Sequence, residues 1–189
     1  MANIRQKKES SGSLQSKIVN TIQHNKTQLI FVVAVVLSMV VYYTFTGTQW
    51  FRQDVLPHYL EILARITSYL LTIFGEKIVI LRTVVQSPSF AMDIAYGCDA
   101  LEPITLFSVV VLCFPAQFKA KITGVLSGIL FLFTLNIFRL LTLYYAGTYS
   151  YELFELFHIE IWQPVFIICA LVLFLFYVGI IRKKGWANV

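Results

Sequence analysis

The chain has 189 residues, of which 58% are hydrophobic and only 13% are charged, and its mean hydropathy is +0.73. A soluble domain carries about twice that share of charge, so the composition excludes an ordinary soluble domain and indicates an integral membrane protein. The formal net charge is +5, but the basic residues flank apolar runs instead of forming a groove, which argues against nucleic acid as a partner. The three cysteines, Cys98, Cys113 and Cys169, are odd in number and lack CxxC spacing, so neither a disulfide framework nor a metal cluster is predicted, and no cofactor is expected.

The first apolar run, Leu29 to Phe45, contains no charged residue, and residues 29–46 are predicted to form the first of about four transmembrane helices. Residues 1–28 ahead of it are expected to be a basic cytoplasmic tail. The first helix is interpreted as a retained anchor, because its polar lead is long and no small-residue cleavage site follows it.

Residues 54–75 are predicted to form a helix with Asp54 as its N-cap and Gly75 as its end. The helix carries Glu61 and Arg65 four residues apart on one face. A span here would put the later loops on the wrong side of the membrane. We therefore expect an amphipathic helix at the outer interface.

Two extended runs follow in "KIVILRTVVQSPSFAMDIAYG", residues 77–97, around the turn sequence "QSPS". Apolar residues alternate with smaller or polar ones from Phe90 to Tyr96, as in a half-buried strand. This pattern predicts a short extracytoplasmic β-hairpin.

Three further spans are expected, at about residues 99–115, 120–147 and 161–181. Gly124 and Gly128 form a GxxxG motif in the second of these, which favours close helix packing. The predicted fold class is an all-α integral membrane protein with one membrane domain, residues 29–181. A basic cytoplasmic tail, residues 182–189, is expected after it.

Charge predicts the orientation of the chain. The stretch before residue 29, the loop after Pro115 and the C-terminus together carry ten basic residues and one acid, Glu9, whereas the other nine acids lie in or beside the remaining loops. By the positive-inside rule, both termini and residues 115–121 are expected in the cytoplasm. The membrane that the spans cross is expected to be the plasma (inner) membrane of a prokaryotic cell.

Cys98 is then expected on the extracytoplasmic side, where a strand passes into a helix. A helix N-terminus lowers the pKa of a thiol, but Asp99 beside it acts in the opposite direction, so a nearby cation is required. Arg139 lies deep in an apolar helix, where a guanidinium is costly unless it faces a polar site. Asn136 lies on the same face, three residues earlier.

His158 precedes the last span on the same side, with Glu155 and Glu160 near enough in sequence to orient its ring. A thiol, an imidazole and a guanidinium are the nucleophile, general base and oxyanion stabiliser that acyl transfer through a thioester requires. Structural alternatives remain open: a membrane cysteine often only packs, as is expected for Cys113 and Cys169, and Arg139 can serve solely as a salt-bridge partner of an acid.

At these residues the chain resembles the exosortase/archaeosortase family, whose pattern is a cysteine opening one helix, N-x-x-R in the next and a histidine before the last. Here these read "GCDALEP", "NIFR" and "FHIEIWQPV". The sequences "FPA" and "LYYAG" are similar to the short exosortase H branch in particular. Relatives usually carry a small polar residue and a glycine after the cysteine, where this chain has Asp99 and Ala100.

The resemblance implies a membrane cysteine transpeptidase or protease, with Cys98 as nucleophile, His158 as acid/base and Arg139 as transition-state stabiliser. The substrates it implies are membrane-anchored proteins ending in a short motif, a transmembrane helix and a basic tail. A protease that uses water as acceptor and a non-enzymatic membrane scaffold are the alternatives left open.

Overall fold

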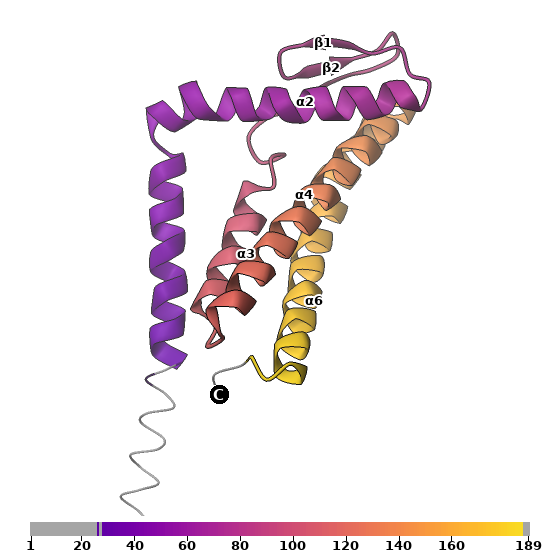
Figure 1. Ribbon diagram of the computed structural model, residues 1–189. Coiled ribbons are helices and arrows are strands. Elements are labelled where there is room, and N and C mark those ends of the chain that lie inside the picture. The colour runs from indigo at the N-terminus through magenta and orange to yellow at the C-terminus, as the bar shows by residue number, and fades with distance from the viewer. Residues whose placement is uncertain (1–25, 27, 187–189) are drawn as a thin grey trace, which may run out of the picture.

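A computed structural model describes residue 26 and residues 28–186. Most of the predicted N-terminal tail, residues 1–28, and the last three residues of the predicted C-terminal tail, residues 182–189, therefore lie outside the described residues. The chain is mostly helical, with one small sheet (Figure 1). In chain order the elements are an N-terminal helix (Gln28–Thr46), a π-helical segment η1 (Phe51–Val55), α2 (Leu56–Ile73), β1 (Val79–Leu81), β2 (Val84–Gln86), β3 (Ala91–Asp93), α3 (Leu101–Cys113), α4 (Phe118–Tyr149), α5 (Tyr151–Glu155), a second π-helical segment η2 (Leu156–Ile161) and α6 (Trp162–Lys183).

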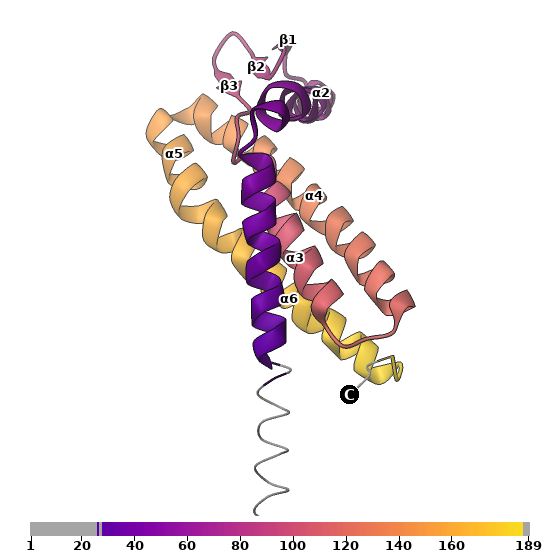
Figure 2. The ribbon, with the colours of Figure 1, turned by 90° about the vertical axis from the view of Figure 1, so that its left-hand side faces the viewer.

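Three helices of the described chain are long and apolar enough to cross a membrane: the N-terminal helix, α4, and the rod formed by α5, η2 and α6 (Figure 2). The fourth predicted span, α3, is shorter than expected, since it has 13 residues and covers about 20 Å. It begins at Leu101 because the preceding residue, Ala100, is left-handed, and it ends before the extended residue Phe114.

The basic ends of the spans share one side of the molecule. The backbone N–H of Gln117, just before α4, donates to the carbonyl of Trp186, just after α6, at 2.9 Å. The visible start of the N-terminal helix lies at the same end, and the sheet and α2 lie at the other (Figure 1). This arrangement agrees with the segregation of charge, while the membrane side that each end faces stays a prediction.

Helix α2 lies across the spans, as an interfacial helix would (Figure 1). One face is buried, including Leu60, Leu63 and Leu71. The prediction of Asp54 as N-cap is wrong, because the helical path begins earlier: the backbone N–H of Phe51 donates to Thr48 Oγ1 at 3.3 Å, and η1 runs directly into α2.

The predicted end of this helix at Gly75 agrees with the structure. Gly75 has φ +94°, a conformation that favours glycine, and the next N–H, of Glu76, donates back to the carbonyl of Leu71 at 3.1 Å. Glu61 Oε1 pairs with Nε of Arg82, in the turn between β1 and β2, at 3.6 Å.

The predicted hairpin is a three-stranded antiparallel sheet, in the order β1-β2-β3. The turn sequence "QSPS" connects β2 to β3, and Ser87 closes it by donating through its hydroxyl to the carbonyl of Phe90 at 3.1 Å. A second turn, where Arg82 has φ +57°, divides the first extended run into two strands. The sheet packs against α2 and leads the chain to Cys98.

Close packing holds α3 and α6 against α4, as the GxxxG motif predicts. A Cβ on Gly124 would meet the ring of Tyr177 at 2.5 Å, and one on Gly128 would meet the ring of Phe107 at 2.0 Å. Both glycines therefore admit an aromatic ring from a neighbouring helix. The N-terminal helix contrasts with these three helices. Only 6% of the residues in its apolar stretch are buried, against 39% of those in the apolar stretch of α4.

Candidate active site

A sharp turn carries Cys98 between the sheet and α3. Gly97 has φ +92° and Ala100 has φ +58°, so two left-handed residues flank the cysteine and aspartate. The carboxylate of Asp99 sits inside the turn, where it accepts from the backbone N–H of Leu101 at 2.9 Å and from that of Gly97 at 3.3 Å. Asp99 therefore binds the first N–H of α3 and closes the turn at the same time.

Three consecutive carbonyls of this turn each accept a hydrogen bond from a side chain of another helix. From α4, Arg139 Nη1 donates to the carbonyl of Gly97 at 3.2 Å and Asn136 Nδ2 donates to that of Cys98 at 3.0 Å. From α2, the Tyr59 hydroxyl donates to the carbonyl of Asp99 at 2.8 Å. We call these three side chains the clasp, and together they fix the backbone that carries the thiol.

The thiol and the imidazole meet. Cys98 Sγ lies 3.4 Å from His158 Nε2, within hydrogen-bond distance for sulfur, although 60 residues separate them in sequence. Cys98 is buried, at 8% exposure, whereas His158 is half-buried in η2. The His158 ring lies against Phe154, one helical turn earlier, with centroids 5.6 Å apart. The structure thus brings together the predicted nucleophile and base.

Electrostatics around the thiol act in two directions. Burial raises the pKa of the Cys98 thiol, the positive charge of Arg139 opposes this, and the negative charge of Asp99 adds to the increase. The net direction is upward, so the surroundings of Cys98 favour the protonated thiol over the thiolate. This chemistry needs a base in contact with Sγ, which is where Nε2 of His158 lies.

Arg139 and Asn136 are buried at 7% and 0% exposure. Within the described chain, Arg139 Nε and Asn136 Oδ1 are buried without a hydrogen-bond partner. Arg139 also forms no ion pair among the described residues, and its guanidinium lies over the ring of Phe166 with 5.7 Å to the centroid. Arg139 is therefore not a salt-bridge partner of any described acid, and its Nε–H is left without an acceptor.

The two glutamates near His158 make no hydrogen bond to its ring. Glu155 and Glu160 are exposed, and no hydrogen bond found among the described residues joins either carboxylate to the ring. Their supporting role stays a prediction. Cys113 and Cys169 are half-buried free thiols on α3 and α6, away from this cluster.

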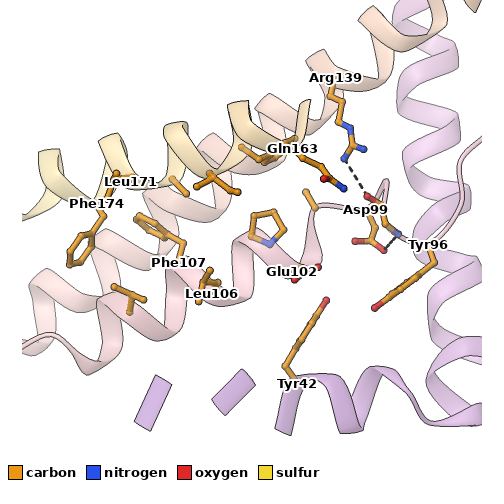
Figure 3. A pocket seen from close by; sticks show the side chains of 17 residues that line it. Tyr42, Tyr96, Asp99, Glu102, Leu106, Phe107, Arg139, Gln163, Leu171 and Phe174 are labelled. Carbon is orange, nitrogen blue, oxygen red and sulfur yellow. Dashed lines mark hydrogen bonds between the residues drawn. The ribbon is translucent and has the colours of Figure 1, made fainter. Parts of the chain in front are cut away.

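A cavity of about 600 Å³ adjoins the turn, and Gly97, Asp99 and Ala100 are part of its lining (Figure 3). Polar side chains line its near end: Tyr42, Tyr96, Asp99, Glu102, Arg139 and Gln163. Apolar side chains of α3 and α6 line the remainder, among them Leu106, Phe107, Leu171 and Phe174. No group of three or more histidine, cysteine or acidic side chains among the described residues could hold a metal ion.

Sequence reasoning missed Tyr59, whose hydroxyl completes the clasp. Burial, with a contribution from the charge of Asp99, raises the pKa of Tyr59 to about 12, so the hydroxyl stays a donor. The available signal was its place near the buried stripe of α2, where a polar side chain requires a partner. Tyr42 and Gln163 at the cavity were missed as well, and nothing in the local sequence marks them.

A buried thiol paired with an imidazole, beside an arginine inside an apolar helix bundle, defines a membrane-embedded candidate for thiol-dependent acyl transfer. The chain matches the model of the transmembrane exosortase family (Exosortase_EpsH) over residues 25–182, and it belongs to that family. It is therefore a multi-pass membrane protein of a family that generally consists of membrane transpeptidases acting on sorting signals. No curated protein and no solved structure matches it.

Proposed function

We propose that the chain is a membrane cysteine transpeptidase or protease that cleaves the C-terminal sorting signal of membrane-anchored proteins and transfers them to an acceptor. The observation that carries the proposal is the 3.4 Å contact between Cys98 Sγ and His158 Nε2. Family membership supports the same class of reaction.

In the first half of the reaction, His158 Nε2 takes the proton of the Cys98 thiol as Sγ attacks the scissile carbonyl carbon. The tetrahedral oxyanion gains hydrogen bonds from guanidinium N–H groups of Arg139 that are left over after it bonds Gly97. His158 then gives its proton to the leaving amine, the C–N bond breaks, and an acyl thioester remains on Cys98.

In the second half, the acceptor attacks the thioester carbon while His158 removes a proton from the acceptor. The C–S bond breaks, and His158 gives this proton to the sulfur, which restores the thiol. Water as acceptor gives hydrolysis, and an amine or hydroxyl of another molecule gives transfer. Mass spectrometry of the C-terminus of the processed product separates these outcomes, because transfer adds the mass of the acceptor.

We further propose that the site faces the extracytoplasmic side of the plasma (inner) membrane, with both termini in the cytoplasm. The segregation of basic residues supports this orientation. A cysteine introduced at Tyr149 should react with an impermeant thiol reagent added outside intact cells. A cysteine introduced at Gln117 should react only after permeabilisation. Labelling of Gln117→Cys in intact cells contradicts the orientation.

The reaction is tested by trapping the thioester. With a membrane-anchored substrate, mass spectrometry should find an acyl adduct on Cys98, and Cys98→Ala should abolish cleavage so that uncut precursor accumulates. Cys98→Ser should lower turnover at least about 10³-fold, since a hydroxyl ionises far less readily than a thiol.

Cys113→Ala and Cys169→Ala are matched controls that should process substrate normally, because each thiol acts as a small apolar group within a helix. Normal processing by Cys98→Ala, with the precursor absent, would overturn the proposal and favour a scaffold.

A further inference from the structure

The sheet that packs against α2 has two edge strands, and one of them leads to the nucleophile. The strands lie in the order β1-β2-β3, and β3 passes through a short segment into the turn that carries Cys98. In Figure 2, β3 is the strand nearest α5 and β1 is the strand farthest from it. The outer edge of β3 is therefore turned toward the helical rod that carries His158.

The register of the sheet shows which backbone groups this edge presents. Just past the paired residues, the N–H of Ile94 donates to the carbonyl of Thr83 at 3.1 Å. Directly opposite residues of an antiparallel pair alternate between those that exchange hydrogen bonds and those that do not. Because Ile94 is bonded toward β2, Met92 is bonded toward β2 as well. Ala91 and Asp93 therefore direct their N–H and C=O groups away from β2.

These outward groups are available for pairing. No hydrogen bond among the described residues uses the outward N–H or C=O of Ala91 or Asp93, and both residues are exposed. The Asp93 carboxylate accepts from the Thr83 hydroxyl at 2.7 Å, which holds this side chain on the sheet. An edge of this kind is a template for an extended chain that pairs through its own main chain.

Aromatic contacts connect the same strand to the base. The ring of Phe90, directly before β3, lies 5.7 Å from the ring of Phe154, which lies 5.6 Å from the ring of His158. Gly147 of α4 makes room for Phe90, because a Cβ there would meet this ring at 2.1 Å. Strand β3 thus begins beside the segment of the base and leads to the nucleophile. A chain paired with its edge runs toward the contact between Cys98 and His158.

The direction of such a chain follows from the proposed function, on which this step rests. In a membrane-anchored substrate, the segment before the scissile bond lies outside the membrane and the segment after it enters the membrane as a helix. The protein's own chain takes the same course from β3 through Cys98 into α3 (Figure 2). A substrate that follows this course runs parallel to β3.

We propose that the outer edge of β3 binds the extended segment of the substrate that precedes the scissile bond, as a fourth strand parallel to β3. The N–H groups of Ala91 and Asp93 donate to carbonyls of this segment, and their C=O groups accept from its N–H groups. Main-chain pairing does not depend on the side chains of the substrate. The edge therefore contributes affinity and register, and delivers the scissile carbonyl to Cys98.

Peptidyl chloromethyl ketones test the pairing without requiring turnover. The probe is a mixed-sequence peptide about as long as the chain from Ala91 to Cys98, with the chloromethyl ketone at its C-terminus. Cys98 Sγ displaces the chloride, a C–S bond forms, and the thiol proton passes to the buffer. Mass spectrometry of the full-length protein in vesicles measures the rate of this alkylation.

The positions at which the peptide backbone matters give the decisive pattern. In a paired strand, only every second residue directs its N–H and C=O toward the neighbouring strand. N-methylation of one peptide residue at a time should lower the alkylation rate about tenfold at alternate positions and have little effect between them. Equal effects at all positions, or no effect at any, would overturn the proposal.

The opposite edge of the sheet provides a matched control. By the same alternation, Ile80 of β1 directs its N–H away from β2. Proline at either edge removes an N–H that has no partner in the sheet. Ala91→Pro should lower alkylation of Cys98 by the peptide about tenfold, and Ile80→Pro should leave it unchanged. An equal loss in the two variants contradicts the proposal.

Iodoacetamide controls for damage to the turn, because it alkylates Cys98 without a peptide chain. It should react at the wild-type rate in both proline variants. If Ala91→Pro also slows iodoacetamide, the N-methylation pattern measured on the wild-type protein decides the question by itself.

A diazirine at the N-terminus of the peptide tests the direction of the chain. After alkylation of Cys98 and illumination, parallel pairing should place the cross-links on Phe90 and Ala91. Cross-links to Leu106 or Leu171 would place the peptide in the cavity and overturn the edge site.

These results are separable from those that test the proposed reaction. An alternating N-methylation pattern without processing of any membrane-anchored precursor would leave the edge as a peptide-binding site and remove the enzyme proposal. Processing that depends on Cys98, without the alternating pattern, would keep the enzyme and remove the edge site.

Discussion

The two halves of the candidate catalytic pair are held in different ways. Cys98 is a buried residue in a turn whose carbonyls are bound by Arg139, Asn136 and Tyr59. His158 lies in η2, a π-helical segment without a buried residue, and its one side-chain hydrogen bond among the described residues goes to Cys98. The backbone of the nucleophile is thus fixed by tertiary contacts, whereas the base depends on the path of one helical rod.

The comparison has a physical consequence. Removing Asn136 or Tyr59 leaves the carbonyl of a buried residue, Cys98 or Asp99, without a partner, which costs about 1–3 kcal/mol and frees the turn to move. Substitutions near His158 fall in a more exposed segment and should be tolerated better, unless they replace His158 itself. The predictions below separate the clasp from the rest of the site, from the largest expected effect to the smallest.

Arg139→Lys should lower turnover about 10²–10³-fold while the protein remains in the membrane. Lysine can keep the charge and one hydrogen bond to Gly97, but it loses the planar set of donors that also reaches an oxyanion. Processing assays in membranes measure the loss. Arg65→Lys, on the exposed face of α2, is the control; near-normal processing by Arg139→Lys would show that charge alone is needed.

Tyr59→Phe should lower turnover about tenfold and decrease thermal stability, since it leaves the carbonyl of Asp99 without a donor and removes nothing else. A positioning role predicts that kcat falls while KM is unchanged and that the pH profile of Cys98 alkylation moves. A purely structural role would change stability alone. Tyr69→Phe, at a side chain that is 69% exposed, should change neither property.

Asp99→Asn should move alkylation of Cys98 to lower pH. The carboxylate helps to raise the pKa of the thiol, so removing its charge lowers that pKa and more thiolate is present at a given pH. The amide oxygen can still accept from Leu101, which preserves the start of α3. Alkylation rates across pH measure the shift, and a profile that moves to higher pH would contradict this electrostatic account.

Sequence alone predicted much of the site because its residues carry strong local signals. Arg139 and Asn136 stand out as polar residues in an apolar helix, and Cys98 and His158 lie where spans begin. Tyr59 gave no such signal, since its partner is 40 residues away and only tertiary folding brings the two together. The cavity was equally hidden, because its walls are ordinary apolar residues of two separate helices.

The turn itself also could not be predicted. Two extended runs indicate a hairpin, but the left-handed residue Arg82 that creates a third strand looks like any surface arginine. The sequence shows that Asp99 and Ala100 differ from the residues that usually follow the cysteine, but it does not show what these two residues do. In the structure the Asp99 carboxylate accepts from the first N–H of α3, and Ala100 occupies a position with φ +58° that suits glycine.

Ala100→Gly should therefore stabilise the protein by about 1 kcal/mol, because a left-handed conformation costs an alanine roughly that much and costs a glycine almost nothing. Added backbone freedom in the unfolded chain offsets part of the gain, so the expected rise in melting temperature is small. If the strain helps to hold Cys98 against His158, turnover should fall slightly as stability rises. The control is Ala95→Gly, at the exposed residue before the turn, where φ is negative and stability should decrease. Calorimetry and processing assays on the two variants measure both effects, and a loss of stability in Ala100→Gly would show that the left-handed alanine is not strained.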